Sequence, residues 1–182
     1  FIGRMLFSKG VKDFVDVARI FNKNKLNKKK FILVGGTDSE NPDHVPQNTL
    51  MKWKKEGCVD WLDNVKDVPK ILKNAKLVCF PSQYGEGIPK ALIEAASCGR
   101  PIIAYDIPGC KEIVKNGKNG FLIQSNDIKG ISIAIDKIFS YKDTELQKIA
   151  KFSSDMVIKE FSEEVIFKQI IGIYDKVKCS KK

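Results

Sequence analysis

The sequence predicts an α/β fold in which helices cover a parallel, doubly wound sheet and further helices follow at the C-terminal end. Short continuous apolar runs at 31–34 and 77–80 fit parallel strands that are buried on both faces. Segments with apolar residues at helical spacing alternate with such runs over residues 1–125. This alternation of strand and helix indicates a parallel sheet with right-handed crossovers.

The expected elements of this βα core follow one another along the chain. An opening strand ends at Gly3-Arg4-Met5, and the first helix places Val11, Phe14, Val15, Ala18 and Phe21 on one face. The remaining elements, in order, are a strand at 31–34, a helix at about 47–55, a strand at 58–62, a helix beginning at 67–69, a strand at 77–80, a helix opening near Ile88 or Pro89 and closing at 98–99, a strand at 101–105, a helix at 111–114 and a strand at 121–123.

Residues 126–182 are expected to form a helical tail on the same single domain. Three segments have helical spacing: one through Ile128 and Phe139, one near 143–159, and one from about Ser162. The last segment carries an apolar stripe that we expect to belong to the core, with part of it exposed as the alternative. The stripe is made of Ile166, Ile170, Ile173, Tyr174 and Val177.

Length and composition set the broad class. A chain of 182 residues with 43% hydrophobic residues supports one domain with an ordinary core. No apolar run reaches the roughly 18 residues of a membrane span, and no signal-peptide pattern is present. Five cysteines without CxxC spacing favour a reducing cytoplasm. Because the first residues read as the inside of a strand, we interpret the chain as a fragment cut at a domain boundary.

The formal net charge of +10 comes almost entirely from lysine. The lysines are spread along the chain, with one cluster at 23–30, and the only arginines are Arg4, Arg19 and Arg100. Nucleic-acid binding is not expected, because it more often uses arginine with interleaved aromatic residues. Solvated lysine faces explain the charge best, and peripheral contact with an anionic membrane surface is the alternative.

A candidate ligand site follows the strand at 77–80. Proline at 89 suits the start of a helix, and the free amides of a helix start attract phosphate. Glu86 and Glu94, eight positions apart, flank this start. Carboxylates repel phosphate but accept hydrogen bonds from hydroxyl groups, so the pair predicts a ligand that carries both. A sugar nucleotide fits that description.

Two cations are expected to complete this site. Arg4 and Lys9 follow the opening strand, and in doubly wound sheets ligands bind at the carboxyl ends of the strands. Together they could neutralise a diphosphate leaving group as its bond to the sugar breaks. An Asp-x-Asp pair after a strand, the usual support for a metal ion, is absent, so we expect metal-free chemistry and no cofactor beyond the donor substrate.

Several motifs together resemble one family, the retaining glycosyltransferases of family 4. They are Gly3-Arg4 with Lys9-Gly10, Val34-Gly35, Pro81-Ser82, the E-x7-E pair Glu86 and Glu94, and the stretches 95–101 and 108–113. The resemblance covers about residues 1–125. It implies a GT-B enzyme, in which two Rossmann-like domains face each other across a cleft. This chain would be the C-terminal, nucleotide-sugar-binding domain, and the N-terminal acceptor domain is absent from it.

The resemblance also implies a role for each site residue. Arg4 and Lys9 would hold the diphosphate, Glu94 the ribose hydroxyls, and Glu86 the donor sugar. The loop at Asn64-Val65 would contact the base, and Gly87-Ile88-Pro89 would position the donor, which is most often a UDP-sugar in such enzymes. The subgroup that builds lipid-linked polysaccharide looks closest, with a lipid-linked or saccharide acceptor. Here Gly87-Ile88-Pro89 replaces the family's more usual glycine and aromatic, which changes the shape expected for the sugar pocket.

Other readings stay open. The two glutamates could be solvated carboxylates at a helix end, Arg4 could form a structural ion pair, and Lys9 could be an ordinary surface lysine. At the level of function, the alternatives are a sugar-nucleotide epimerase of the same architecture and a non-catalytic nucleotide-sugar-binding subunit. In any of these cases we expect the fragment alone to be inactive as a transferase.

Overall fold

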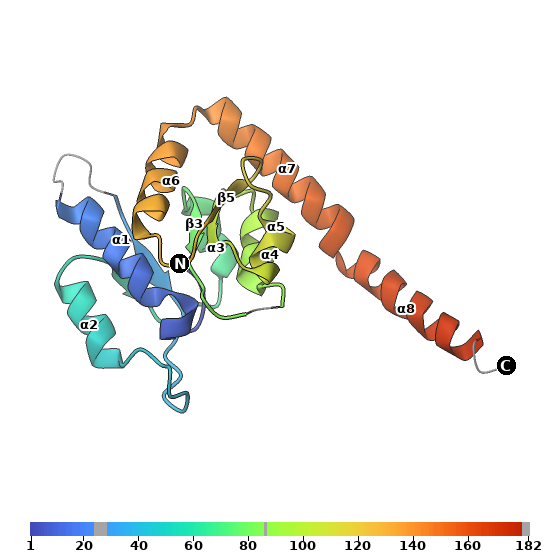
Figure 1. The fold of residues 1–182 in the computed structure, drawn as a ribbon, viewed down its shortest axis with the longest axis horizontal. Helices are drawn as coiled ribbons and strands as arrows, with labels where there is room; N and C mark the ends of the chain where they lie inside the picture. The colour runs from blue at the N-terminus through green and yellow to red at the C-terminus, as the bar shows by residue number, and fades with distance from the viewer. Residues whose placement is uncertain (24–28, 86, 180–182) are drawn as a thin grey trace.

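A computed structural model describes residues 1–23, 29–85 and 87–179, with the side chain of residue 179 left out (Figure 1). It contains five short parallel strands: β1 (Ile32–Val34), β2 (Asp60–Leu62), β3 (Val78–Phe80), β4 (Ile102–Tyr105) and β5 (Gly120–Ile123). They form two hydrogen-bonded groups, in the order β1-β2 and β3-β4-β5. All pairs are parallel, as the alternation of strand and helix predicts.

The opening segment differs from the expected strand. It runs beside β1, where Gly3 donates to the carbonyl of Val34 and Val34 donates to that of Phe1. Only one parallel bridge, between Ile2 and Val34, joins the segment to β1. The aromatic rings of Phe1 and Phe80 stack with centroids 6.0 Å apart, so the segment also lies against β3. It therefore sits between the two strand groups without closing them into one ladder.

Helices connect the strands and extend the chain beyond them. They are α1 (Val11–Lys23), α2 (Gln47–Lys55), α3 (Val68–Asn74), α4 (Lys90–Ser97), α5 (Pro108–Ile113), α6 (Ile128–Ser140), α7 (Asp143–Phe161) and α8 (Glu163–Cys179), with a 3₁₀ turn η1 (Phe7–Lys9) before α1. Side chains cap the starts of α3 and α6, where Asp67 accepts from the amide of Lys70 and Asp127 from that of Gly130.

Two helix starts differ from those expected. The helix α4 begins at Lys90 with Pro89 as its N-cap, just after the expected opening. The helix α5 begins at Pro108, three residues before the expected start, because proline is preorganised for the first turn and needs no hydrogen-bond partner there.

The core lies between helices on the two sides of the strands. In Figure 1, α1 and α6 lie on one side, and α4 and α5 lie on the other. The helix α6 contacts β4 and β5, whereas α4 contacts β3 and β4. Residues from both layers are completely buried, among them Met5, Leu33, Leu92, Ile103, Tyr105 and Ile138. The predicted α/β class with C-terminal helices is confirmed.

The apolar stripe of α8 is not part of this core. Figure 1 shows α8 running away from the body as an arm that leads to the C-terminus. Its large apolar side chains are exposed, namely Ile166, Phe167, Ile170, Ile171, Ile173, Tyr174 and Val177. The expectation that this stripe faces the core is therefore wrong for the chain as described. The preceding helix α7 does pack on the body and buries Ile149, Met156 and Val157.

Candidate functional site

The predicted site residues follow the carboxyl ends of neighbouring strands, which places them along one edge. Arg4 and Lys9 follow the opening segment, Gly36 follows β1, and Asn64 follows β2. The loop of residues 81–89, which we call the donor loop, follows β3. Glu86, the predicted contact to the donor sugar, lies outside the described residues. The other predicted residues can be placed individually.

Residues 8–10, which we call the Lys9 segment, are in direct main-chain contact with the donor loop. The carbonyl of Ser8 accepts hydrogen bonds from the amides of Gln83 (2.8 Å) and Tyr84 (3.2 Å) and from the hydroxyl of Ser82 (3.4 Å). Gly10 adopts φ +77°, and a Cβ there would come within 1.8 Å of the carbonyl oxygen of Pro81. Only glycine allows so close an approach in this conformation. Residues more than 70 positions apart are thus held together.

Lys9 lies at the end of η1 and is half-buried. Its ammonium nitrogen lies 6.0 Å from the centroid of the Phe80 ring, at the carboxyl end of β3. Burial lowers the pKa of Lys9, and the nearby charge of Arg4 lowers it further, while Cys110 acts in the opposite direction. Two cations therefore share this edge, an arrangement that an anionic ligand would stabilise.

Arg4 is more exposed than Lys9 and already pairs with a carboxylate. Its Nη1 lies 2.8 Å from Oδ2 of Asp38, and 60% of its side chain is exposed. The predicted structural ion pair is thus present. This ion pair does not use all the N–H donors of Arg4, because a guanidinium carries five of them and the bond to Asp38 uses one nitrogen. Arg4 can bind a phosphate on its exposed side while Asp38 orients it.

The last residues of the donor loop lead directly into α4. Gly87 and Ile88 are exposed, and Pro89 is buried as the N-cap, where its carbonyl accepts from the amides of Leu92 and Ile93. Glu94 is 33% exposed and lies 3.6 Å from the ammonium of Lys90, one turn earlier. The two side chains can separate readily, because exposed ion pairs of this kind contribute little. Glu94 is therefore accessible to hydroxyl groups.

The expected base-binding loop packs against the diglycine after β1. Asn64 is exposed and Val65 is half-buried. A Cβ on Gly36 would lie 2.6 Å from the side-chain nitrogen of Asn64, and a Cβ on Gly35 would lie 2.0 Å from the carbonyl oxygen of Gly3. The diglycine thus allows close approach of backbone and side chains. It also brings Asn64 near the opening segment.

Four residues at this edge were not expected from the sequence. The buried hydroxyl of Tyr105 donates to Oδ2 of Asp13 (2.7 Å), and the same oxygen accepts from Nε2 of Gln83 (3.0 Å). Nε2 of Gln83 also donates to Oδ1 of Asn126 (2.7 Å). The partners are 43 to 92 positions apart, so no local motif marks them. Asn126 does have a local signal, because asparagine tolerates its φ of +67°.

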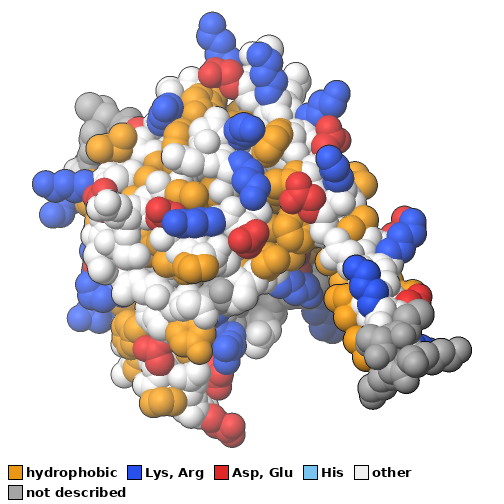
Figure 2. Space-filling view, turned by 45° about the vertical axis from the view of Figure 1, so that its right-hand side comes forward, with side chains coloured by type: hydrophobic (Ala, Val, Ile, Leu, Met, Phe, Trp, Pro, Cys, Tyr) orange, Lys and Arg blue, Asp and Glu red, His pale blue; other side chains and the backbone are white. Residues whose placement is uncertain are grey.

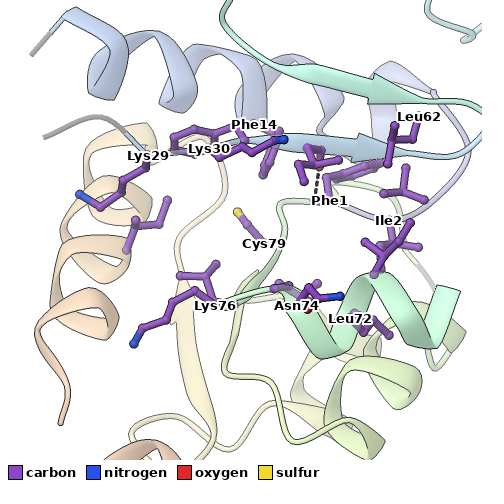
Figure 3. A pocket seen from close by; sticks show the side chains of 18 of the residues that line it. Phe1, Ile2, Phe14, Lys29, Lys30, Leu62, Leu72, Asn74, Lys76 and Cys79 are labelled. Atoms are coloured by element: carbon purple, nitrogen blue, oxygen red, sulfur yellow. Dashed lines mark hydrogen bonds between the residues drawn. The ribbon is translucent and has the colours of Figure 1, made fainter. Parts of the chain in front are cut away.

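A large cavity lies beside β1 and β3. It has a volume of about 590 Å³ and includes Phe1, Phe14, Leu72 and Cys79 in its lining. Figure 3 shows Lys29 and Lys76 at its margin. None of the predicted site residues lines it. In doubly wound sheets ligands bind at the carboxyl ends of strands, so we assign the site to that edge rather than to this cavity.

The described residues contain no group of three or more His, Cys, Asp or Glu side chains arranged to hold a metal ion. The same residues include no helix that combines the length and apolar character needed to cross a bilayer. Figure 2 shows Lys and Arg side chains scattered over the visible face among Asp and Glu, without one continuous basic patch. This distribution agrees with solvated lysine faces.

A family model described as "Glycosyl transferases group 1" matches residues 1–153. The chain belongs to this glycosyltransferase family. Among curated relatives of this group 1 chain is a Campylobacter jejuni N,N'-diacetylbacillosaminyl-diphospho-undecaprenol alpha-1,3-N-acetylgalactosaminyltransferase, 31% identical over 176 residues. The match covers 97% of this chain and 44% of the relative. An Escherichia coli UDP-Gal:alpha-D-GlcNAc-diphosphoundecaprenol alpha-1,3-galactosyltransferase is also 31% identical, with 97% and 43% covered.

Solved glycosyltransferase structures have the same fold as this group 1 chain. Anabaena Alr3699/HepE in complex with UDP matches with a TM-score of 0.82 and 22% identity, over 96% of this chain and 47% of that one. A glycosyltransferase from Rickettsia africae matches with a TM-score of 0.83 and 21% identity, over 97% and 46%. The fold is thus the Rossmann-like fold found in GT-B glycosyltransferases, and the chain spans about half the length of these proteins.

Proposed function

We propose that this chain is the donor-binding domain of a nucleotide-sugar-dependent glycosyltransferase that builds a lipid-linked glycan or polysaccharide, with a UDP-sugar as donor. The observation that carries the proposal is the contact between the Lys9 segment and the donor loop through the Ser8 carbonyl. It joins two cations to a helix start at one sheet edge. The curated relatives act, by their names, on diphospho-undecaprenol-linked sugars, and one uses UDP-Gal.

In this proposal Arg4 and Lys9 stabilise the departing diphosphate. The bond between the anomeric carbon and the diphosphate oxygen breaks, and negative charge grows on that oxygen. Two nearby cations, one of them half-buried, lower the energy of this charge in the transition state. With these cations in place the step needs no metal ion. Family 4 membership and retention of anomeric configuration remain part of the proposal, through the motif resemblance.

The remaining site residues bind the uncharged parts of the donor. We assign the ribose hydroxyls to Glu94 and the base to Asn64 and Val65. Gly87, Ile88 and Pro89 lie where the diphosphate meets the sugar. Glu86 keeps its proposed role as the contact to the donor sugar.

The acceptor is proposed to bind to a second domain. Relatives are about twice as long as this chain, and the exposed apolar stripe of α8 offers a surface for such a domain. We place the enzyme in the cytoplasm, with peripheral contact to the membrane that holds a lipid-linked acceptor. On its own, without the acceptor domain, this chain is not expected to transfer sugar.

Titration with sugar nucleotides tests the proposal. We expect calorimetry on the full-length protein to detect binding of a UDP-sugar. Arg4→Ala or Lys9→Ala should lower its turnover by on the order of 100-fold, the loss typical of one oxyanion-stabilising donor. Lys12→Ala is the matched control, because Lys12 is an exposed lysine on α1 that pairs with Asp16. Wild-type turnover in both site variants, or no binding of any nucleotide sugar, would contradict the assignment.

A further inference from the structure

The amide side chain of Gln83 connects three segments at the carboxyl edge. It lies in the donor loop, whereas Asp13 is in the first turn of α1 and Asn126 follows β5. One nitrogen, Nε2, donates to both, at 3.0 Å to Asp13 and 2.7 Å to Asn126. An amide group has two N–H donors, so this nitrogen is used completely. The side chain of Gln83 thus connects residues 81–85 to α1 and to the segment after β5.

One partner of Gln83, Asp13, is itself anchored to a residue of the core. Tyr105, the last residue of β4, is completely buried, and its hydroxyl donates to Asp13 at 2.7 Å. Burial, followed by the Asp13 carboxylate, raises the pKa of Tyr105, so its hydroxyl stays protonated and keeps donating. Hydrogen bonds to a carboxylate are among the stronger ones in proteins. Asp13 is therefore a fixed acceptor for the Gln83 amide.

We propose that Gln83, held by Asp13 and Asn126, is a positioning residue that keeps residues 81–85 in place beside the Lys9 segment, next to the sugar end of the donor. This inference rests on the proposed function. The carbonyl of Ser8 fixes the main chain of the same loop beside Lys9. The side-chain amide of Gln83 adds contacts to Asp13 on α1 and to Asn126 after β5. Main-chain and side-chain attachments together hold residues 81–85 beside the cations.

Two variants of similar size separate hydrogen bonding from packing. Gln83→Glu replaces the donor amide by a carboxylate, which cannot donate to two acceptor oxygens and repels Asp13. Gln83→Lys retains donors for both oxygens. The matched control is Gln147→Glu, because Gln147 is also an exposed glutamine but lies on α7. A role in bulk alone would make the Glu and Lys variants behave alike.

Amide exchange and kinetics form the readout, on the protein as its gene encodes it. In Gln83→Glu we expect exchange over residues 81–85 to become about tenfold faster. We expect kcat/KM for a UDP-sugar to fall about tenfold, as for a slightly misplaced binding group. Inhibition by UDP, which lacks the sugar, should stay within about twofold. Gln147→Glu should resemble the parent in both measurements, and Gln83→Lys should resemble it in exchange because it keeps donors for both oxygens.

The outcomes separate this inference from the proposed function. Unchanged exchange in Gln83→Glu overturns the positioning role, as does faster exchange with unchanged kcat/KM. Equal behaviour of the Glu and Lys variants also overturns it. A parent protein that binds no sugar nucleotide contradicts the proposed function alone, because exchange without ligand still tests whether Gln83 holds the loop.

Discussion

Gly10 and Gly57 have nearly the same backbone conformation in different surroundings. Their φ angles are +77° and +71°. A Cβ on Gly10 would collide with the carbonyl oxygen of Pro81, whereas a Cβ on Gly57 would meet nothing within 4 Å. The two positions therefore separate the cost of a left-handed conformation from the cost of losing a close approach.

We expect Gly57→Ala to lower the free energy of unfolding by about 1 kcal/mol, the cost of a left-handed alanine. Gly10→Ala should lower it by about 3 kcal/mol or more, because the donor loop must also move away from the Lys9 segment. Urea denaturation of both variants measures the difference. Equal losses would show that the Gly10–Pro81 contact contributes nothing.

The pKa of Lys9 depends on the charges around it. Burial lowers its pKa first and the Arg4 charge second, so removing that charge should raise the pKa of Lys9. We expect this rise in Arg4→Gln and not in Arg4→Lys, which keeps a cation at position 4. Nuclear magnetic resonance of ¹³C-methylated lysines measures the titration directly. A Lys9 titration that is identical in both variants would rule out coupling between the two cations.

At the scale of elements, α7 and α8 are consecutive helices with different dependence on the body. The helix α7 packs on α4, where Gly99 approaches the Cβ of Ala150 so closely that a Cβ on the glycine would lie 2.7 Å from it. The helix α8 packs on α7 and exposes most of its large apolar side chains. Of these two helices, we therefore expect α7 and not α8 to stabilise the βα core.

Two deletions test this difference. Removing residues 162–182 should change the free energy of unfolding by no more than about 1 kcal/mol and should reduce binding of a hydrophobic dye. Removing residues 143–182 should destabilise the core by several kcal/mol, because side chains under α7 become exposed at about 1.5–3 kcal/mol each. Chemical denaturation of the two truncated chains checks both values. A similar large loss in both would mean that α8 stabilises the core.

Local sequence patterns predicted the helices and strands well where nearby residues alone determine the ends of an element. The bounds of α2 agree with the expected 47–55, since apolar spacing and the polar stretches around it define both ends. The stripe on α8 was misassigned because periodicity shows that a face is apolar but not what covers it. The opening segment was expected to be a strand, yet it makes a single bridge, because pairing depends on neighbours that its own residues do not specify.

At the scale of the whole molecule, topology explains which part of the site was predictable. Arg4 and Lys9 follow the opening segment and Asn64 follows β2, and both of these run parallel to β1, so the topology places them at the same edge without any knowledge of side-chain contacts. Gln83 and Tyr105 could not be found this way. Their roles arise from hydrogen bonds between segments up to 92 positions apart, which only the folded chain reveals.

The bond between the Ser8 carbonyl and the donor loop also limits how members of this family can exchange parts. A chimaera that imports residues 81–89 from a relative with another sugar preference would place new backbone against the old Ser8 and Gly10. The transplanted stretch and residues 8–13 therefore have to be exchanged together. Grafts that carry both pieces should preserve the spacing between the cations and the sugar, whereas grafts of the loop alone would have to re-establish it.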